Sequence, residues 1–87
     1  MTSIGETKKL VKGIASKLSG LSKSLETSAT RFESAKIRAE RVLTGSSTDV
    51  EAAVVGKMKK AADEATEAKQ EVDKAIQSCT QYSQSKI

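Results

Sequence analysis

Few side chains in this sequence have the chemistry that an enzyme or a metal site requires. Histidine, the commonest general base and metal ligand, is absent. The single cysteine, Cys79, lies on an apolar helical row, where a small buried side chain is expected rather than a nucleophile. No serine stands in a glycine-flanked turn with a base at hand, and no glycine-rich phosphate loop is present. We therefore expect no enzyme activity, small-molecule substrate, cofactor or metal.

The acidic residues of the second half do not predict a metal site either. The heptad pattern assigns these residues to the outer, solvated face of a helix: Asp63, Glu64, Glu67, Glu71 and Asp73. Lys60 with Glu64 and Lys69 with Asp73 have the four-residue spacing of ion pairs within a helix. A solvated face with charges of both signs accounts for all of them.

The net charge of +4 is concentrated near the beginning of the chain. Against Glu6, the first 25 residues hold these bases: Lys8, Lys9, Lys12, Lys17 and Lys23. A basic end can meet nucleic acid, anionic lipid or an acidic partner. The lysines form no single stripe and no aromatic residues interleave with them, so nucleic acid is not expected as a partner and a solvated helix face is the preferred interpretation.

Apolar residues recur every seventh position through both halves of the sequence. In the first half the rows are Ile4, Val11, Leu18, Leu25, Phe32, Ala39 and Thr7, Ile14, Leu21, Ser28, Ala35, Val42. In the second half the rows are Met58, Ala65, Val72, Cys79 and Val54, Ala61, Ala68, Ala75, Tyr82. This is a sustained heptad pattern, and no strand period fits it. We predict an all-α fold with one helix over about 4–44 and a second over about 49–83.

The break at about 45–48 separates the helices and sets their direction. Gly45 can adopt the left-handed conformation that ends a helix. Thr48 with Glu51, and Ser3 with Glu6, match the capping box of a helix start. So short a connection makes neighbouring helices antiparallel. Residues 1–87 are therefore expected to form one helical-hairpin domain about 60 Å long.

A single seam between two helices gives a thin core. We expect the seam to contain Val11, Leu18, Leu21, Leu25, Phe32, Val54, Met58 and Val72, with Phe32 across from residues 61–65 as its anchor. Leu10, Val55 and Ile76 are left at its margins and form the candidate face for a partner. A second helical hairpin packed there would complete a four-helix bundle.

The turn residues Leu43-Thr44-Gly45 carry a resemblance to a known family. With helices of near-equal length on either side, they resemble the small W-x-G helical-hairpin proteins of bacterial type VII secretion, with Leu43 in the place of the tryptophan and Gly45 in that of the glycine. Tyr82 resembles the aromatic residue of that family's export signal, with Lys86 where the signal has an acid. The chain is most similar to the divergent branch of small helical proteins that accompanies Leu-x-Gly toxins.

The resemblance implies an adaptor that binds a toxin's helical N-terminal domain and targets it for export, or a small secreted effector. The partner would be a helical protein, in a heterodimer or a homodimer, and membrane association would come through the secretion machinery. The opening residues form no signal peptide and no stretch reaches membrane-spanning length, so we expect a cytoplasmic protein that is secreted without a cleaved signal. A coiled-coil homo-oligomeric scaffold and a basic helix that binds membrane or nucleic acid stay open as alternatives.

Overall fold

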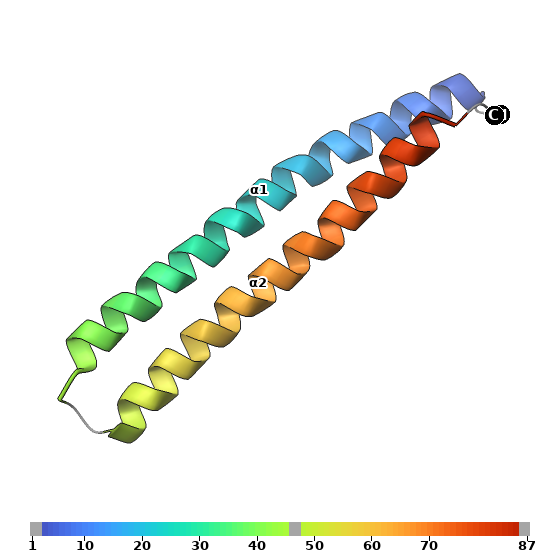
Figure 1. The fold of residues 1–87 in the computed structure, drawn as a ribbon. Coiled ribbons are helices and arrows are strands. Elements are labelled where there is room, and N and C mark those ends of the chain that lie inside the picture. Colours follow the sequence, from blue (N-terminus) through green and yellow to red (C-terminus); the bar gives the residue numbers. More distant parts are fainter. Residues whose placement is uncertain (1–2, 46–47, 86–87) are drawn as a thin grey trace.

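The protein is a hairpin of two long antiparallel helices (Figure 1). The computed structural model describes residues 3–45 and 48–85, with α1 spanning Ile4–Leu43 and α2 spanning Thr48–Ser83. The molecule measures 65 × 19 × 14 Å. The prediction of an all-α hairpin is confirmed, and the predicted helix bounds differ from the observed ones by a single residue at the turn.

The ends of α1 follow from local chemistry. Ser3 caps the helix, since its Oγ accepts a hydrogen bond from the Glu6 backbone N–H at 3.1 Å. Beyond the other end, Gly45 has a φ of +88°, the left-handed conformation predicted for it. α2 begins at Thr48, whose side chain lies outside the described part of the structure, and the capping box predicted for that side chain with Glu51 lies there too.

The helices meet through small side chains. Among the described residues, only Ser22 of α1 and Ala62 and Ala65 of α2 are buried. On α1, half-buried and buried residues alternate at spacings of four and three: Val11, Ala15, Leu18, Ser22, Leu25 and Ala29. Alanine and serine on the contact allow the two backbones to approach closely. We call the two rows to which these residues belong the contact rows of α1.

The second row predicted for the seam of α1 is half-buried at Thr7, Ser28 and Ala35, but its large residues are exposed. Its large residues Ile14, Leu21 and Val42 are 51%, 47% and 72% exposed. The row one residue further on, which includes Ala15 and Ser22, makes the contact instead. Phe32 also fails as the anchor, because it stays 38% exposed at the edge of the contact. The contact thus includes the small residues Ala15 and Ser22, and the large residues Ile14, Leu21 and Val42 lie outside it.

α2 shows the same displacement by one residue. The row of Met58, Ala65, Val72 and Cys79 is half-buried or buried, as predicted. Its companion in the contact is the row Val55, Ala62, Lys69, Ile76 and Ser83, whereas Ala75 and Tyr82 of the predicted companion row are exposed. Val55 and Ile76, which the sequence places on the partner face at the seam's margins, are half-buried in the same row as Ala62. Leu10, the third member of that face, is exposed.

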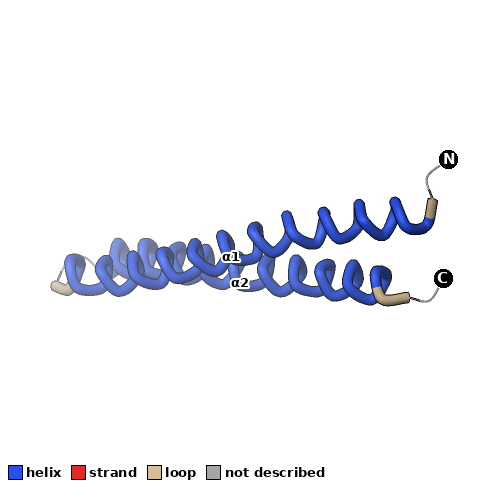
Figure 2. The backbone as a smooth tube through the Cα atoms, turned by 90° about the horizontal axis from the view of Figure 1, so that it is seen from above, coloured by secondary structure: helices blue, strands red, loops and turns tan. Residues whose placement is uncertain are grey.

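Two perpendicular views show that the helices coil about each other. They are separated near the turn in Figure 1 and near the termini in Figure 2, which is the behaviour of a supercoiled pair. Rows with a seven-residue period therefore keep a constant position relative to the contact along the whole hairpin.

Candidate partner-binding face

One side of the hairpin is apolar along both helices. A hollow toward the turn end joins Ala35 and Val42 of α1 to Val54 of α2, which places the two displaced rows on the same side. We call this side the apolar face. Its apolar members are Ile14, Leu21, Ala35 and Val42 of α1, and Val54, Ala61, Ala68, Ala75 and Tyr82 of α2. Of the two rows that the sequence placed between the helices on each helix, one thus makes the contact and the other lies beside it, with one flank open.

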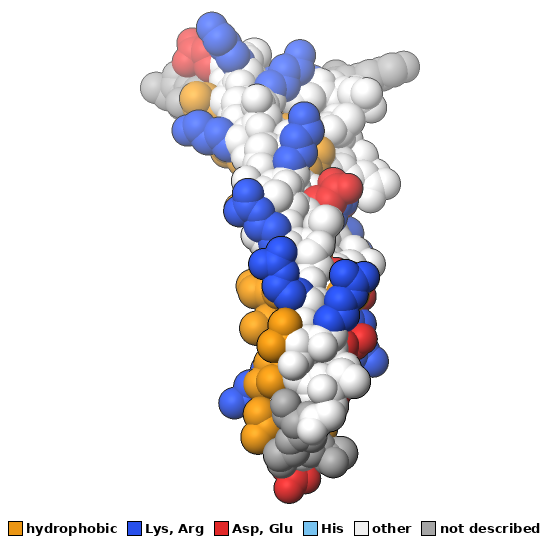
Figure 3. All heavy atoms as spheres, turned by 90° about the vertical axis from the view of Figure 1, so that its left-hand side faces the viewer, with side chains coloured by type: hydrophobic (Ala, Val, Ile, Leu, Met, Phe, Trp, Pro, Cys, Tyr) orange, Lys and Arg blue, Asp and Glu red, His pale blue; other side chains and the backbone are white. Residues whose placement is uncertain are grey.

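The hollow at the turn end of the apolar face has arginines at its edge. Arg31 and Arg38 line it together with Ala35, Ala39, Val42, Leu43 and Val54. Figure 3 shows hydrophobic side chains gathered toward the turn end of the molecule, with Lys and Arg side chains above and beside them. Leu43, predicted as a turn-motif residue, is half-buried here and contributes to the apolar floor.

Arg31 and Arg38 belong to a basic margin along α1. Together with Lys17 they stand four residues before Leu21, Ala35 and Val42, which puts each base one turn away on the same side of the helix. All three are exposed, and the ion pairs found between described residues use other bases. The sequence alone did not indicate this margin, because the three bases can be placed beside the apolar face only once the contact rows are known.

The opposite side of the hairpin is charged and internally paired. Its hollows are lined by residues such as Glu33, Glu40 and Asp63. Half-buried Lys36 lies 3.0 Å from Glu33, and the hydrogen bond and charge of that carboxylate, aided by the charges of Glu40 and Asp63, raise the pKa of the Lys36 ammonium. The two sides of the hairpin therefore differ: the opposite side has charged residues in its hollows, whereas the hollow of the apolar face is lined mainly by apolar residues with Arg31 and Arg38 at its edge.

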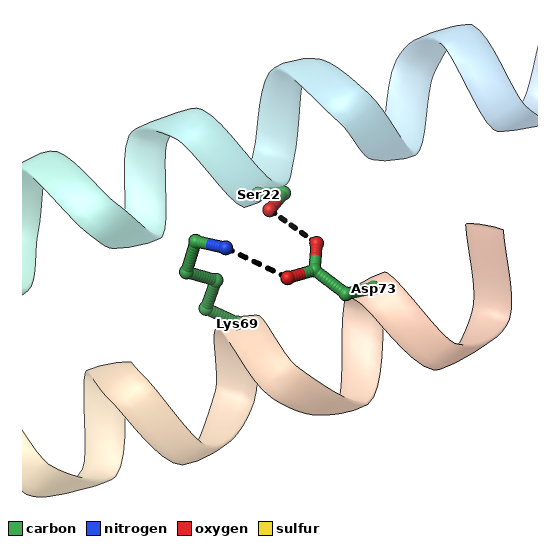
Figure 4. Close-up of polar contacts among 3 residues, drawn as sticks. All are labelled: Ser22, Lys69 and Asp73. Carbon is green, nitrogen blue, oxygen red and sulfur yellow. Dashed lines mark hydrogen bonds and ion pairs between the residues drawn. The ribbon is translucent and has the colours of Figure 1, made fainter. Parts of the chain in front are cut away.

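A polar contact crosses between the helices at mid-length (Figure 4). Ser22 Oγ donates a hydrogen bond to Asp73 Oδ1 at 2.6 Å, and Lys69 Nζ donates to Asp73 Oδ2 at 2.7 Å. The bond from Lys69, followed by the bond from Ser22, lowers the pKa of the Asp73 carboxyl. Because Ser22 is buried, this bond fixes which level of α1 faces Asp73.

This contact corrects the position predicted for Asp73. The sequence pattern put Asp73 on the outer face of its helix, but it is half-buried and turned toward α1. Its predicted pairing with Lys69 is confirmed, as is that of Lys60 with Glu64 at 3.9 Å. The sequence feature that indicates this position is Ser22, a polar residue that lies between Leu18 and Leu25 on the contact side of α1 and needs a polar partner on α2.

Other candidate residues take no part in a shared site. Cys79 is half-buried on its contact row, and Tyr82 is exposed near the end of α2, while Lys86 lies outside the described residues. Within residues 3–45 and 48–85, no group of three or more Cys, Asp or Glu is arranged to hold a metal ion. Neither described helix has an apolar stretch long enough to cross a membrane.

Comparison with known proteins gives no relative for this chain. No family model, curated protein or solved structure matches it. The apolar face is therefore interpreted from its own geometry.

Proposed function

We propose that this protein is a non-enzymatic interaction module that binds another helical protein through its apolar face and completes a four-helix bundle. The observation that supports this is one apolar heptad row on each helix that lies beside the contact, with both of these rows on the same side of the hairpin. A four-helix bundle requires such a pair of rows on each helix, one for the partner within the hairpin and one for the second hairpin.

The surface area of the hairpin supports the same proposal. Its accessible surface is 6587 Å², whereas a compact monomer of 9.2 kDa exposes roughly 4,900 Å². The excess of about 1,700 Å² exceeds the roughly 800 Å² that one partner contributes to a standard interface. A second hairpin laid along the apolar face would reduce this excess.

The finer proposal is that the module serves bacterial type VII secretion as an adaptor for a toxin's helical N-terminal domain, or as a small secreted effector. It is supported by the near-equal helices and by Leu43 and Gly45 at the turn, with Gly45 in the left-handed conformation. On this proposal Tyr82 is the remnant of an export signal, and the protein stays in the cytoplasm until it is exported without a cleaved leader.

The experiment is a binding measurement on two matched variants. The purified chain is co-expressed with the helical proteins encoded beside its gene, and complexes are measured by sedimentation velocity. Ile14→Asp with Leu21→Asp places carboxylates on the apolar face and should abolish the complex, since a charge buried at an interface is costly. Both residues are about half exposed in the hairpin, so its helicity by circular dichroism should persist.

Ile37→Asp is the control, because Ile37 is exposed on the opposite side of α1. The complex should survive this change. A stable monomer that binds none of the co-expressed proteins would refute the proposal. Self-association alone would favour the scaffold alternative, and binding that needs only the N-terminal lysines would favour a membrane or nucleic-acid binder.

A further inference from the structure

We propose that the basic margin selects the occupant of the apolar face: a helix pair whose facing edge carries aspartate or glutamate, and not a second copy of this chain. The proposal rests on the proposed function and adds the partner's chemistry to it. The margin consists of Lys17, Arg31 and Arg38, and the last two line the apolar hollow itself.

The position of these bases makes them selective. Each stands one helical turn from an apolar-face residue, at the rim where the edge of a docked helix would lie. Rim charges have modest effects on affinity in water, but they steer association and penalise a like-charged partner. Arginine adds a planar group suited to a carboxylate, and ion pairs within the described residues do not occupy Arg31 or Arg38.

A second copy does not offer the complementary edge. If α1 packed on α1 of the second copy, two basic margins would face each other. If α1 packed on α2 instead, the facing margin would hold Lys57, Glu64 and Glu71, each four residues before the row of Ala61, Ala68 and Ala75. If the two copies adopted the register that the Ser22–Asp73 bond sets within one hairpin, Arg31 would be level with Glu64 but Arg38 with Lys57. One attraction is offset by one repulsion, so self-pairing gains little from charge.

An anionic membrane is also a poorer occupant. Along α2 the margin of the apolar face holds Glu64 and Glu71 beside Lys57, and these two carboxylates would repel acidic headgroups. Because the helices coil about each other, the face also winds around the molecule and suits a coiled partner better than a flat surface.

The test uses a designed probe: a copy of this chain with Lys17→Glu, Arg31→Glu and Arg38→Glu. Its edge is acidic and its apolar rows are unchanged, and all three residues are exposed, so the hairpin should fold. Packing α1 on α1 would then pair the unmodified margin with three carboxylates. Sedimentation of the equimolar mixture should show a one-to-one complex whose Kd is roughly tenfold or more below that of either self-complex at low salt. The advantage should shrink as ionic strength rises from about 0.05 M to about 0.5 M.

The control probe carries the same change in net charge on exposed residues away from the apolar face: Lys9→Glu, Lys23→Glu and Arg41→Glu. The mixture with this probe should show no advantage over self-association. Equal binding of both probes would overturn the proposal, because net charge alone would then explain it. Self-association of the unmodified chain as tight as the mixed complex would overturn it as well.

Two further outcomes separate this inference from the proposed function. If Ile14→Asp with Leu21→Asp abolishes association but the margin probe behaves like the unmodified chain, the charge selection is wrong and the apolar-face function stands. Binding of the chain to phosphatidylglycerol–phosphatidylcholine vesicles, with no association in any mixture, would replace the protein partner by a lipid surface and overturn the inference.

Discussion

At the scale of single residues, Asp73 links the two helices and makes their pairing sensitive to acid. Its carboxylate accepts hydrogen bonds from Lys69 and from buried Ser22. Its pKa is lowered from the ordinary 3.8, so the charged form is favoured by folding. The resulting stability is fully present above the ordinary aspartate pKa and is lost as the pH falls through the lowered folded value.

We expect Asp73→Asn to flatten the loss of stability below about pH 4. Urea unfolding at neutral pH and at about pH 2–3 measures this, with the difference between the two free energies smaller in the variant than in the unmodified chain. Glu71→Gln is the control, because Glu71 is exposed and pairs only with Lys74 on its own helix at 3.2 Å. If both substitutions change the acid response equally, the contact with Ser22 has no special role.

At the scale of the helices, the sequence predicted the ends better than the faces. Ser3 and Gly45 carry strong local signals, since a cap and a left-handed glycine act within a few residues. The faces depend on which rows meet, and a seven-residue period identifies apolar rows without saying which neighbour fills them. The seven-residue period assigns Ile14 and Leu21 to the seam, yet small Ala15 and Ser22 permit the closer approach.

Gly45 is the point at which the turn can be tested. Its φ of +88° is unfavourable for any residue with a Cβ, and among the described residues beyond its chain neighbours no atom lies within 4 Å of the position that a Cβ would take. The strain of a substitution is therefore a backbone effect. Gly45→Val should destabilise the hairpin by about 1–2 kcal/mol in thermal or urea unfolding, and Gly45→Asn by less.

Gly13 provides the matched control for this prediction. It lies inside α1 with ordinary helical φ, and there too no atom lies within 4 Å of the place where a Cβ would be added. Gly13→Ala should stabilise the chain by about 0.5–1 kcal/mol. If Gly45→Val left stability unchanged, the Leu43-Thr44-Gly45 turn would lose its physical basis.

At the scale of the whole molecule, one of the two rows that the heptad pattern assigns to the seam of each helix differs from the row that makes the contact. The shift has the same direction on both helices. On both helices the contact uses the row one residue beyond the expected one, so Leu21 and Ala75 end on the same open side. The sequence therefore identified the apolar rows of this face. Their assignment to a partner needs the structure, because only the structure shows that these rows lie beside the contact and do not face each other. The basic margin follows from that assignment and could not be found before it.

The last prediction follows from a molecule that buries so little by itself. With 6587 Å² still accessible, folding removes only about half of the unfolded chain's surface from water, less than the roughly 60% typical of small domains. Thermal unfolding of the isolated chain should therefore begin at a low temperature and rise with protein or partner concentration, because a ligand of the folded state stabilises it by mass action. A partner at 100 times its Kd adds about 2.7 kcal/mol, and each kcal/mol raises the Tm of a domain this size by roughly 4–8 °C. Melts with and without an equimolar acidic-margin probe measure the shift, and Ile14→Asp with Leu21→Asp should remove it. A high Tm that is independent of concentration and of the probe would show that the hairpin is complete without a partner.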